Sequence, residues 1–426
     1  MIKNLQDKIF KLTKKWGKII GLDLTYFVKN GFWVAVRQII GMIAGLSISI
    51  SFARLASQEI FGQYQFVLSV LSIVSILSIP GLNTAITQSV ARGYDGDYKK
   101  VVRMSFFWSL LGTPILLFIG GYYYIYQSHS LGVAFMIASV FFPFFYAPNT
   151  WDAFLQGKSR FDISTKYSSV QMTLNAVTTI VVVFLNRDKL IPIVVMYLAS
   201  YTFFNGYYYF KSLKYIENEK TDSGTIKYGW FLTKINFLGI IANNIDNVLV
   251  GILLGPSTLA AYVIISLLAN KYKDIAKVFV SVAIPKMSVM NYGIKSIVFI
   301  YKKLFIVMML ISALMASVYF VLVPIVNKFL FGDVYVEYYD ISRYYALAIL
   351  FIIPTIFFGY YAQASKKRLT ILVSGPIFQV IRLGMSLFLI YKFKLIGAVI
   401  SYNLLILVLF FLNFATILYE ESTEDG

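Results

Sequence analysis

The chain contains no cysteine and a single histidine, His129, among its 426 residues. The lack of cysteine excludes structural disulfides and thiolate chemistry. Zinc sites need several His or Cys ligands, and haem iron is commonly held by one of these residues, so we expect neither group and no other resident cofactor. No Walker motif occurs, and we therefore do not expect this chain to hydrolyse ATP.

Charge is also scarce, since 14% of the residues are charged, 58% are hydrophobic and the mean hydropathy is +0.72. Apolar runs of about 20 residues, the length that crosses a bilayer as a helix, recur along the whole chain. We therefore predict an all-α polytopic membrane protein with about twelve transmembrane helices. Their predicted limits are 31–52, 63–82, 101–125, 131–154, 165–185, 190–210, 230–254, 258–285, 304–326, 341–364, 369–391 and 395–418.

The first half of the sequence recurs in the second half. Residues 53–70, ARLASQEIFGQYQFVLSV, align with residues 251–268, GILLGPSTLAAYVIISLL, so that Tyr64 falls on Tyr262. An even number of spans separates equivalent points, so we predict two parallel-repeat six-helix bundles around a central cavity. The predicted divisions are a basic interfacial arm at 1–30, bundles at 31–210 and 230–418, a cytoplasmic linker at 211–229 and an acidic cytoplasmic tail at 419–426.

The net charge of +18 would favour nucleic acid as a partner of a soluble protein. Here the basic residues lie mostly between apolar runs. If the chain starts in the cytoplasm, the N-terminal arm and the even-numbered loops with their flanks hold 24 Lys or Arg, against seven in the odd-numbered loops. The positive-inside rule then places both termini in the cytoplasm. We expect membrane lipids, and no nucleic acid, as partners.

A polar stripe interrupts the apolar segment IANNIDNVLVGILLG at 241–255. Asn243, Asp246 and Asn247 share one helix face, which must contact protein or water because a charge in hydrocarbon costs from about 3 to 10 kcal/mol or more. Asp246 is a candidate for Na⁺ or H⁺ coupling or for a hinge contact, and the alternative is hydrogen bonding to a neighbouring helix. At the repeat offset Asp246 falls on Ile48, so the shared fold does not require this carboxylate.

The next predicted span carries a second charged cluster, NKYKDIAK at 270–277. Lys273, Asp274 and Lys277 share a face, and Lys271 can pair with Asp274 three residues on. The excess of positive charge favours Lys271 and Lys273 as contacts for an anionic substrate, with Asp274 as a second candidate for ion coupling. The alternative is that these lysines reach the cytoplasmic surface by snorkelling.

Two arginines complete the set of candidate substrate contacts. Arg37 lies in the first predicted span and Arg382 in the eleventh, where it shares a face with Gln379 and Ser386. Neither has a carboxylate in its own helix. Each therefore either finds one across the bundle, such as Asp152, Asp246 or Asp274, or lines a path for an anion.

The chain resembles the Wzx-type flippases, which transport O-antigen or capsule repeat units and belong to the multidrug/oligosaccharidyl-lipid/polysaccharide exporter superfamily. The resemblance lies in SFARLASQEIFGQYQFVLSVLSIVSILSIPGLNTAITQSVAR at 51–92, DAFLQGKSRF at 152–161, NNIDNVLVGILLGPSTLAAY at 243–262 and IP at 284–285. It implies a bacterial inner-membrane protein of lipopolysaccharide or capsule synthesis. Such a protein moves undecaprenyl pyrophosphate-linked oligosaccharide to the periplasmic leaflet, with glycan polymerase machinery as a further partner.

The resemblance also implies that intramembrane cations meet the pyrophosphate and sugars, for which Arg37, Lys271, Lys273 and Arg382 are the candidates by position. The main alternative is a cation-coupled multidrug exporter of the same superfamily, whose cavity should carry excess carboxylates. A membrane glycosyltransferase or polymerase would need a catalytic lobe outside the membrane, and the short loops leave no room for one. A non-transporting scaffold would tolerate loss of Arg37 and Lys273 together.

Overall fold

The computed structural model describes residues 24–281 and 294–424, and every regular element within them is helical. Most of the predicted basic arm, and the pair at 284–285, lie outside the described residues. The helices are α2 (Leu24–Leu55), α3 (Gln58–Val74), α4 (Gly81–Ala91), α5 (Asp97–Ser109), α6 (Gly112–Tyr126), α7 (His129–Tyr146), α8 (Trp151–Gly157), α9 (Phe161–Leu185), α10 (Leu190–Ser212), α11 (Thr225–Leu254), α12 (Pro256–Ser281), α14 (Ile294–Phe331), α15 (Val336–Tyr339), α16 (Ala346–Ala364), α17 (Arg368–Leu372) and α18 (Phe378–Glu424).

Ten segments of the described chain are long and apolar enough to cross a bilayer. The last of them holds two spans, because α18 breaks at Lys394, where φ is 54°. The hydroxyls of Ser386 and Ser401 lie 3.0 Å apart, and the chain must therefore reverse between them, since a straight helix would separate these residues by about 22 Å. α12 is also long enough to span, although four charged residues interrupt it. The predicted all-α membrane fold with about twelve spans is thus confirmed.

Several predicted spans are not single straight helices. The span predicted at 63–82 is α3 followed by a turn in which Ile79 adopts a φ of 55°, and Pro80 then leads into α4. The span predicted at 101–125 is divided between α5 and α6, and Pro148 divides the one predicted at 131–154 between α7 and α8. Proline has no backbone N–H to donate, which interrupts the helical hydrogen-bond ladder.

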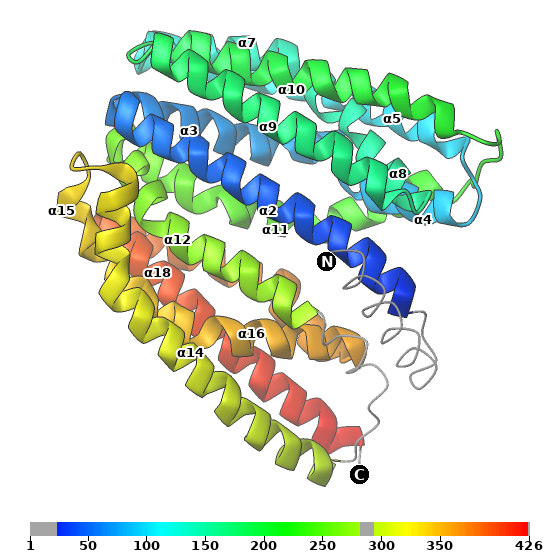
Figure 1. Ribbon diagram of the computed structural model, residues 1–426, viewed down its shortest axis with the longest axis vertical. Helices are drawn as coiled ribbons and strands as arrows, with labels where there is room; N and C mark the ends of the chain where they lie inside the picture. The colour runs from blue at the N-terminus through cyan, green and yellow to red at the C-terminus, as the bar shows by residue number, and fades with distance from the viewer. Residues whose placement is uncertain (1–23, 282–293, 425–426) are drawn as a thin grey trace, which may run out of the picture.

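The two halves of the chain form two groups of helices that meet along a seam. In Figure 1, α2 to α10 lie mainly in the upper part and α12 to α18 in the lower part, while α2 begins and α18 ends on the right. We call that side the termini end, and the side of α15 the opposite end. The largest apolar core lies at the opposite end and takes residues from both halves, including Phe52, Tyr64, Tyr262 and Tyr335. Towards the termini end each half has a smaller core, and Trp230 of α11 packs against that of the first half.

Polar contacts also join the halves at the opposite end. Arg54, in the last turn of α2, donates through Nε to the carbonyl oxygen of Leu330 at 2.8 Å and through a second nitrogen to that of Phe329. Gln58 donates to the carbonyl oxygen of Val334 at 2.9 Å. The arginine thereby satisfies carbonyls that the C-terminus of α14 would leave unpaired.

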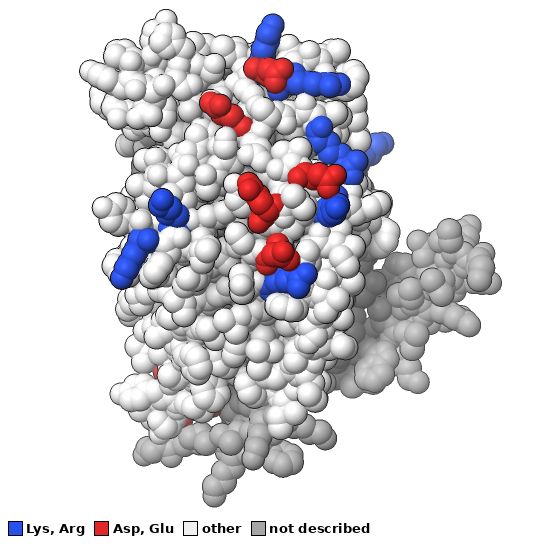
Figure 2. Space-filling view, turned by 90° about the vertical axis from the view of Figure 1, so that its left-hand side faces the viewer, with Lys and Arg blue, Asp and Glu red and all other residues white. Residues whose placement is uncertain are grey.

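Figure 2 shows this end of the molecule, on which basic and acidic side chains are interspersed. Two of the ion pairs at this end are Lys328 with Asp333 and Arg343 with Asp340. The cytoplasmic position of the termini stays a prediction.

The link between the halves is shorter than predicted and is held on the first half. α10 and a 3₁₀ turn continue to Tyr215, which leaves residues 216–224 as the connection to α11. Asp95 accepts hydrogen bonds from the ammonium of Lys158 at 3.0 Å and from the backbone N–H of Glu217 at 2.8 Å. Burial alone would lower the pKa of Lys158, but the hydrogen bonds to Glu217 and Asp95 outweigh it and raise that pKa above its ordinary value.

The structure also differs from the predicted acidic tail. α18 continues to Glu424, so the residues from 419 to 424 are part of the last helix. Glu420 accepts hydrogen bonds from the backbone N–H groups of Leu369 and Thr370, at 2.8 and 3.0 Å, at the start of α17. A carboxylate at a helix N-terminus stabilises it, because it pairs with free N–H groups and the positive end of the helix dipole.

The seam between α3 and α12 depends on a glycine, which yields a first prediction. A Cβ on Gly62 would lie 1.7 Å from the carbonyl oxygen of Pro256, in the backbone of α12. We expect Gly62→Leu to separate the two helices and to lower stability by about 1–3 kcal/mol or more, the usual cost of overpacking. The thermal unfolding midpoint of the detergent-purified protein measures this loss.

Gly206→Ala is the matched control, because nothing lies within 4 Å of the position of its Cβ. This variant should be at least as stable as the unsubstituted chain, since alanine is the better helix former. Equal midpoints for Gly62→Leu and the control would show that α3 and α12 do not pack closely at this point.

Candidate substrate site

The polar stripe of α11 is satisfied by two different neighbours. Asp246 forms an ion pair of 3.2 Å with Arg382 of α18, and Asn243 accepts a hydrogen bond of 3.1 Å from the same guanidinium. Asn247 donates at 3.1 Å to the hydroxyl of Ser69, in α3 of the first half. Asn244 lies off the stripe and donates to its own helix, at the carbonyl of Ile240. The stripe therefore joins α11 to both halves.

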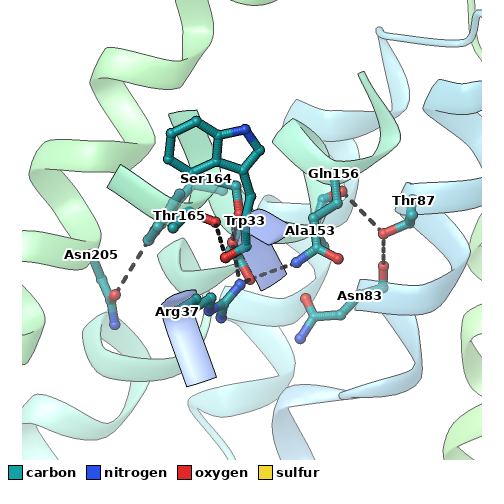
Figure 3. A network of polar contacts seen from close by, with 11 residues as sticks. Trp33, Arg37, Asn83, Thr87, Ala153, Gln156, Ser164, Thr165 and Asn205 are labelled. Carbon is teal, nitrogen blue, oxygen red and sulfur yellow. Dashed lines mark hydrogen bonds and ion pairs between the residues drawn. The ribbon is translucent and has the colours of Figure 1, made fainter. Parts of the chain in front are cut away.

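A second arginine and carboxylate pair lies in the first half. Arg37 of α2 donates to both oxygens of Asp152 in α8, at 2.9 and 2.7 Å. Asp152 also accepts hydrogen bonds from Gln156 and from Ser164 of α9. Figure 3 shows Arg37 within this network, next to the hydrogen bond of Thr165 with the carbonyl of Trp33. The network fixes α2 against α8 and α9 and neutralises both charges.

Both arginines thus find a carboxylate across the bundle, and each does so within its own half. The arrangement is reversed between the repeats, because the first span of the first half carries the arginine and that of the second half carries the aspartate. Arg37 and Arg382 are 29% and 19% exposed, so an incoming anion can still approach each guanidinium. A role of either arginine in binding an anionic substrate stays a prediction.

The lysines of α12 are not neutralised in this way. Within the described residues, neither Lys271 nor Lys273 has an oxygen of Asp or Glu within 4.0 Å, and the pairing of Lys271 with Asp274 is not formed. The ammonium of Lys273 lies 5.3 Å from the ring centre of Tyr402, a cation–π contact. Lys271 and Lys273 are both partly buried, whereas Lys277 is exposed. α12 therefore brings two ammonium groups into the interior without a carboxylate contact.

Lys271 lies at a cavity between the halves. This cavity has a volume of about 310 Å³ and is walled by α2, α3, α9 and α10 of the first half and by Leu267 and Lys271 of α12. Lys271 is its single charged lining residue, and its other polar side chains are hydroxyls and amides. The structure thus brings Lys271 to the seam, while it places Arg37 and Arg382 in separate networks on either side.

Around the Asp246 pair, the second half contains buried polar atoms without partners, and two of them belong to tyrosines that the sequence did not predict for the site. Among the described residues, Asp246 Oδ1, Gln379 Oε1, Arg382 Nε and the hydroxyls of Tyr345 and Tyr402 have no hydrogen-bond partner. Such atoms are costly to bury dry, and internal water commonly satisfies them. Tyr345 ends a 3₁₀ helix and Tyr402 lies in α18, so no local spacing in the sequence predicted that they lie near Asp246.

Metal ligation finds little support in the part of the chain that the structure covers. No group of three or more His, Asp or Glu side chains is close enough there to hold a metal ion. Arg382 pairs with Oδ2 of Asp246 and neutralises its charge, while Oδ1 has no hydrogen-bond partner among the described residues. The candidate ion-coupling roles of Asp246 and Asp274 stay predictions.

Comparison with known proteins matches both the sequence and the fold. The sequence profile of a family described as polysaccharide biosynthesis protein matches residues 27–291. A multidrug resistance MATE family transporter of the MOP superfamily, in an inward-facing conformation, has a TM-score of 0.70 at 14% identity over 91% of this chain and 99% of its own. The lipid II flippase MurJ, in an inward closed conformation, has a TM-score of 0.64 at 13% identity over 92% of this chain and 89% of its own.

A third similar structure is a MOP superfamily transporter from Pyrococcus furiosus, described as having a binding pocket of reverse polarity. It has a TM-score of 0.52 at 13% identity over 92% of this chain and 96% of its own. No curated protein matches the sequence. At these identities, the structural matches establish a shared transporter fold and do not extend to the substrate.

The pair of Arg37 and Asp152 yields a second prediction. Asp152→Asn leaves the guanidinium without its counter-charge, and we expect it to lower the free energy of unfolding by about 1–3 kcal/mol, less than for a fully buried pair because Arg37 is 29% exposed. Adding Arg37→Gln should recover part of the loss, since it removes the unpaired charge. Denaturant unfolding of the two single variants and the double variant measures the coupling.

Arg103→Gln serves as the control, because Arg103 is exposed and has a ring contact with Phe107 but no ion pair within the described residues. This variant should unfold like the unsubstituted chain. Strictly additive losses in the double variant would contradict a direct pairing of Arg37 with Asp152.

Proposed function

Because the chain belongs to the polysaccharide biosynthesis protein family and has the fold of MOP superfamily transporters, we propose that it flips lipid-linked oligosaccharides across a membrane. The proposed substrate is an undecaprenyl pyrophosphate-linked repeat unit, which moves from the cytoplasmic to the periplasmic leaflet of a bacterial inner membrane. The proposed glycans are O-antigen or capsule repeat units, and glycan polymerase machinery would use the flipped product.

The observation that supports this proposal is the pair of lysines on α12. Lys271 and Lys273 lie in the interior without an ion-pair partner in the described structure, and Lys271 lines the cavity at the seam. A purely structural cluster would be neutralised, as Arg37 and Arg382 are. The headgroup, with its pyrophosphate and any charged sugar, provides the negative charge that these ammonium groups lack, and the lipid tail can remain in the bilayer while the headgroup crosses.

The ion pair between Asp246 and Arg382 suggests how binding could be linked to a second ion. Arg382 is 19% exposed, and a pyrophosphate offers it charge-assisted hydrogen bonds at least as strong as those of a carboxylate. If Arg382 turns to the substrate, Asp246 loses its counter-charge and must gain a proton or a Na⁺ ion. Substrate and cation would then bind together, because the substrate would pair with Arg382 while the cation neutralises Asp246.

Movement would follow from the position of the shared core. The halves share their largest core at the opposite end, and towards the termini end the start of α11 also packs on the first half, where the N–H of Gly81 donates to Thr233 at 3.0 Å. Alternating access by rocking of the two groups of helices about the seam would require the contact of α11 with α4 to open or to move with the first half. An inside-negative potential favours outward movement of an anion by about 2.3 kcal/mol per charge for each 100 mV, so the potential alone assists flipping.

A multidrug exporter for cations is the alternative with the same fold. Its cavity should present carboxylates to the ligand, but no Asp or Glu lines the cavity at the seam. Of the three carboxylates considered as partners for the arginines, Asp152 and Asp246 pair with Arg37 and Arg382. Asp274 alone of the three has no ion pair in the described structure. This charge distribution favours an anionic substrate over a cationic one.

A genetic experiment tests the proposed function. Deleting the gene in its host should make lipid-linked repeat units accumulate in the cytoplasmic leaflet and should stop glycan export. Complementation with the Lys271→Gln, Lys273→Gln double variant should restore about one-tenth of export or less, because each charge-assisted contact contributes about 1.5–3 kcal/mol. Single and combined neutral variants of Arg37 and Arg382 extend the series.

The matched control is Lys100→Gln with Lys227→Gln, which removes two exposed charges outside the candidate site. It should export normally at an equal protein level. Normal export by the Lys271 and Lys273 double variant would refute the cationic site, and unchanged distribution of lipid-linked units in the deletion strain would refute the flippase.

Asp246→Asn tests the link to a second ion. In the unsubstituted protein, export should vary with pH or with Na⁺ concentration, because Asp246 must take up a cation when Arg382 leaves it. The asparagine keeps a hydrogen-bond acceptor but needs no cation, so that dependence should disappear. Transport assays in vesicles with imposed pH and Na⁺ gradients measure it, and an Asp246→Asn variant that retains the full dependence would sink the coupling role.

A further inference from the structure

The cavity at the seam has the size of a small-molecule site. Its volume of about 310 Å³ lies at the lower end of the range of roughly 300–1,000 Å³ that is typical for ligand pockets. This is room for one sugar unit, and not for a whole oligosaccharide. Most of its wall belongs to the first half, so it is distinct from the network of Asp246 and Arg382 in the second half.

One side of the cavity is the helix backbone at Gly45 of α2, which places no side chain there. Gly41 also lines the cavity, but a Cβ on it would lie 3.3 Å from Sδ of Met172, so α9 covers α2 closely at that point. A Cβ on Gly45 would lie 4.0 Å from the ammonium of Lys271, so the ammonium lies directly above this part of α2. Glycines at such a position allow a ligand to approach the helix backbone closely.

The other sides combine aromatic rings with hydrogen-bonding groups. The rings of Tyr197 and Tyr201 have centres 5.0 Å apart, and Tyr64 packs edge-on against Tyr197 at 5.6 Å. Gln65 and Asn175 add side-chain amides, and Asn175 is held in place by its hydrogen bond to the carbonyl of Tyr197. Tyrosine presents both an apolar ring and a polar hydroxyl, and the amides supply donors and acceptors.

This lining selects a class of ligand. Aromatic faces suit the C–H face of a sugar ring, while amides and hydroxyls suit its hydroxyl groups. A purely apolar ligand would leave the amides unpaired, which is costly. The single ammonium, with no carboxylate in the lining, adds a preference for one negative charge and against a cation.

We propose that this cavity is a subsite for one sugar unit that carries a negatively charged substituent, either a carboxylate or a phosphate. The sugar contacts Gly45, Asn175 and Tyr201 in the first half, and Lys271 of the second half contacts the charge. The assignment rests on the proposed flippase function and adds to it the place and chemistry of the glycan. Since Lys271 belongs to α12, a bound sugar joins the two halves across the seam.

The absence of cysteine provides a direct test. Gly45→Cys places a single thiol on the wall of the cavity, and Ser49→Cys, a near-isosteric change in the same lining, is a second reporter if the first fails to fold. The rate at which a maleimide labels the purified full chain is measured with glucuronic acid, glucose 1-phosphate, glucose or inorganic phosphate. Ser130→Cys, an exposed position outside the cavity, is the control thiol.

Glucuronic acid and glucose 1-phosphate should protect the cavity thiol at concentrations about tenfold lower than glucose does, because the ammonium contact adds roughly 1.4 kcal/mol or more. Lys271→Gln should remove that difference and leave the protection by glucose, whereas Lys100→Gln should change nothing. The relative strength of the two charged sugars tells whether the site takes a carboxylate or a phosphate.

Several results would overturn the subsite. They are no protection by any sugar, equal protection by glucose and the charged sugars, and protection by inorganic phosphate as strong as by glucose 1-phosphate. The genetic experiment is independent of this one. If the deletion strain accumulates lipid-linked units but no sugar protects the thiol, the flippase function is supported and the sugar subsite is refuted. If charged sugars protect the thiol but the deletion strain exports its glycan normally, the cavity binds sugars and the flippase function is refuted.

Discussion

The constraint on which this structure depends is the cost of an unpaired charge in hydrocarbon. Arg37 and Arg382 meet it by binding aspartates on neighbouring helices, which fixes α2 on α8 in one half and α11 on α18 in the other. Because these pairs settle the charges inside each half, the lysines that remain on α12 stand out. Lys271 lies at the seam and Lys273 lies against Tyr402 of α18, and the proposed function assigns an anionic substrate to both.

The two halves contribute different chemical groups to the candidate site. The first half supplies a cavity with tyrosines, amides and bare glycine backbone, and the second half supplies charge. Such a division suits a substrate that is itself divided into sugars and phosphates. The proposed function and the proposed sugar subsite thus describe two parts of one headgroup, each matched to a different wall.

The sequence predicted the membrane class and the approximate number of spans well, because these depend on the length of apolar runs. The break at Lys394 falls between the predicted spans 369–391 and 395–418, but the break at Ile79 lies inside the predicted span 63–82 and was missed. The candidate site was predicted residue by residue but not as a set of contacts. Arg37 and its partner are 115 positions apart, and Arg382 and Asp246 are 136 apart, so no helical spacing could decide between pairing and ligand binding.

The location of these ion pairs has a kinetic consequence. Each ion pair that the described residues form between membrane helices lies within one half, and the seam is crossed by hydrogen bonds to neutral acceptors, such as those of Arg54 and Gln58 with carbonyls and of Asn247 with Ser69. Relative motion of the halves therefore separates no opposite charges in the bilayer. In the proposed alternating access, the barrier to this motion would come from a few hydrogen bonds and apolar surface rather than from the separation of opposite charges.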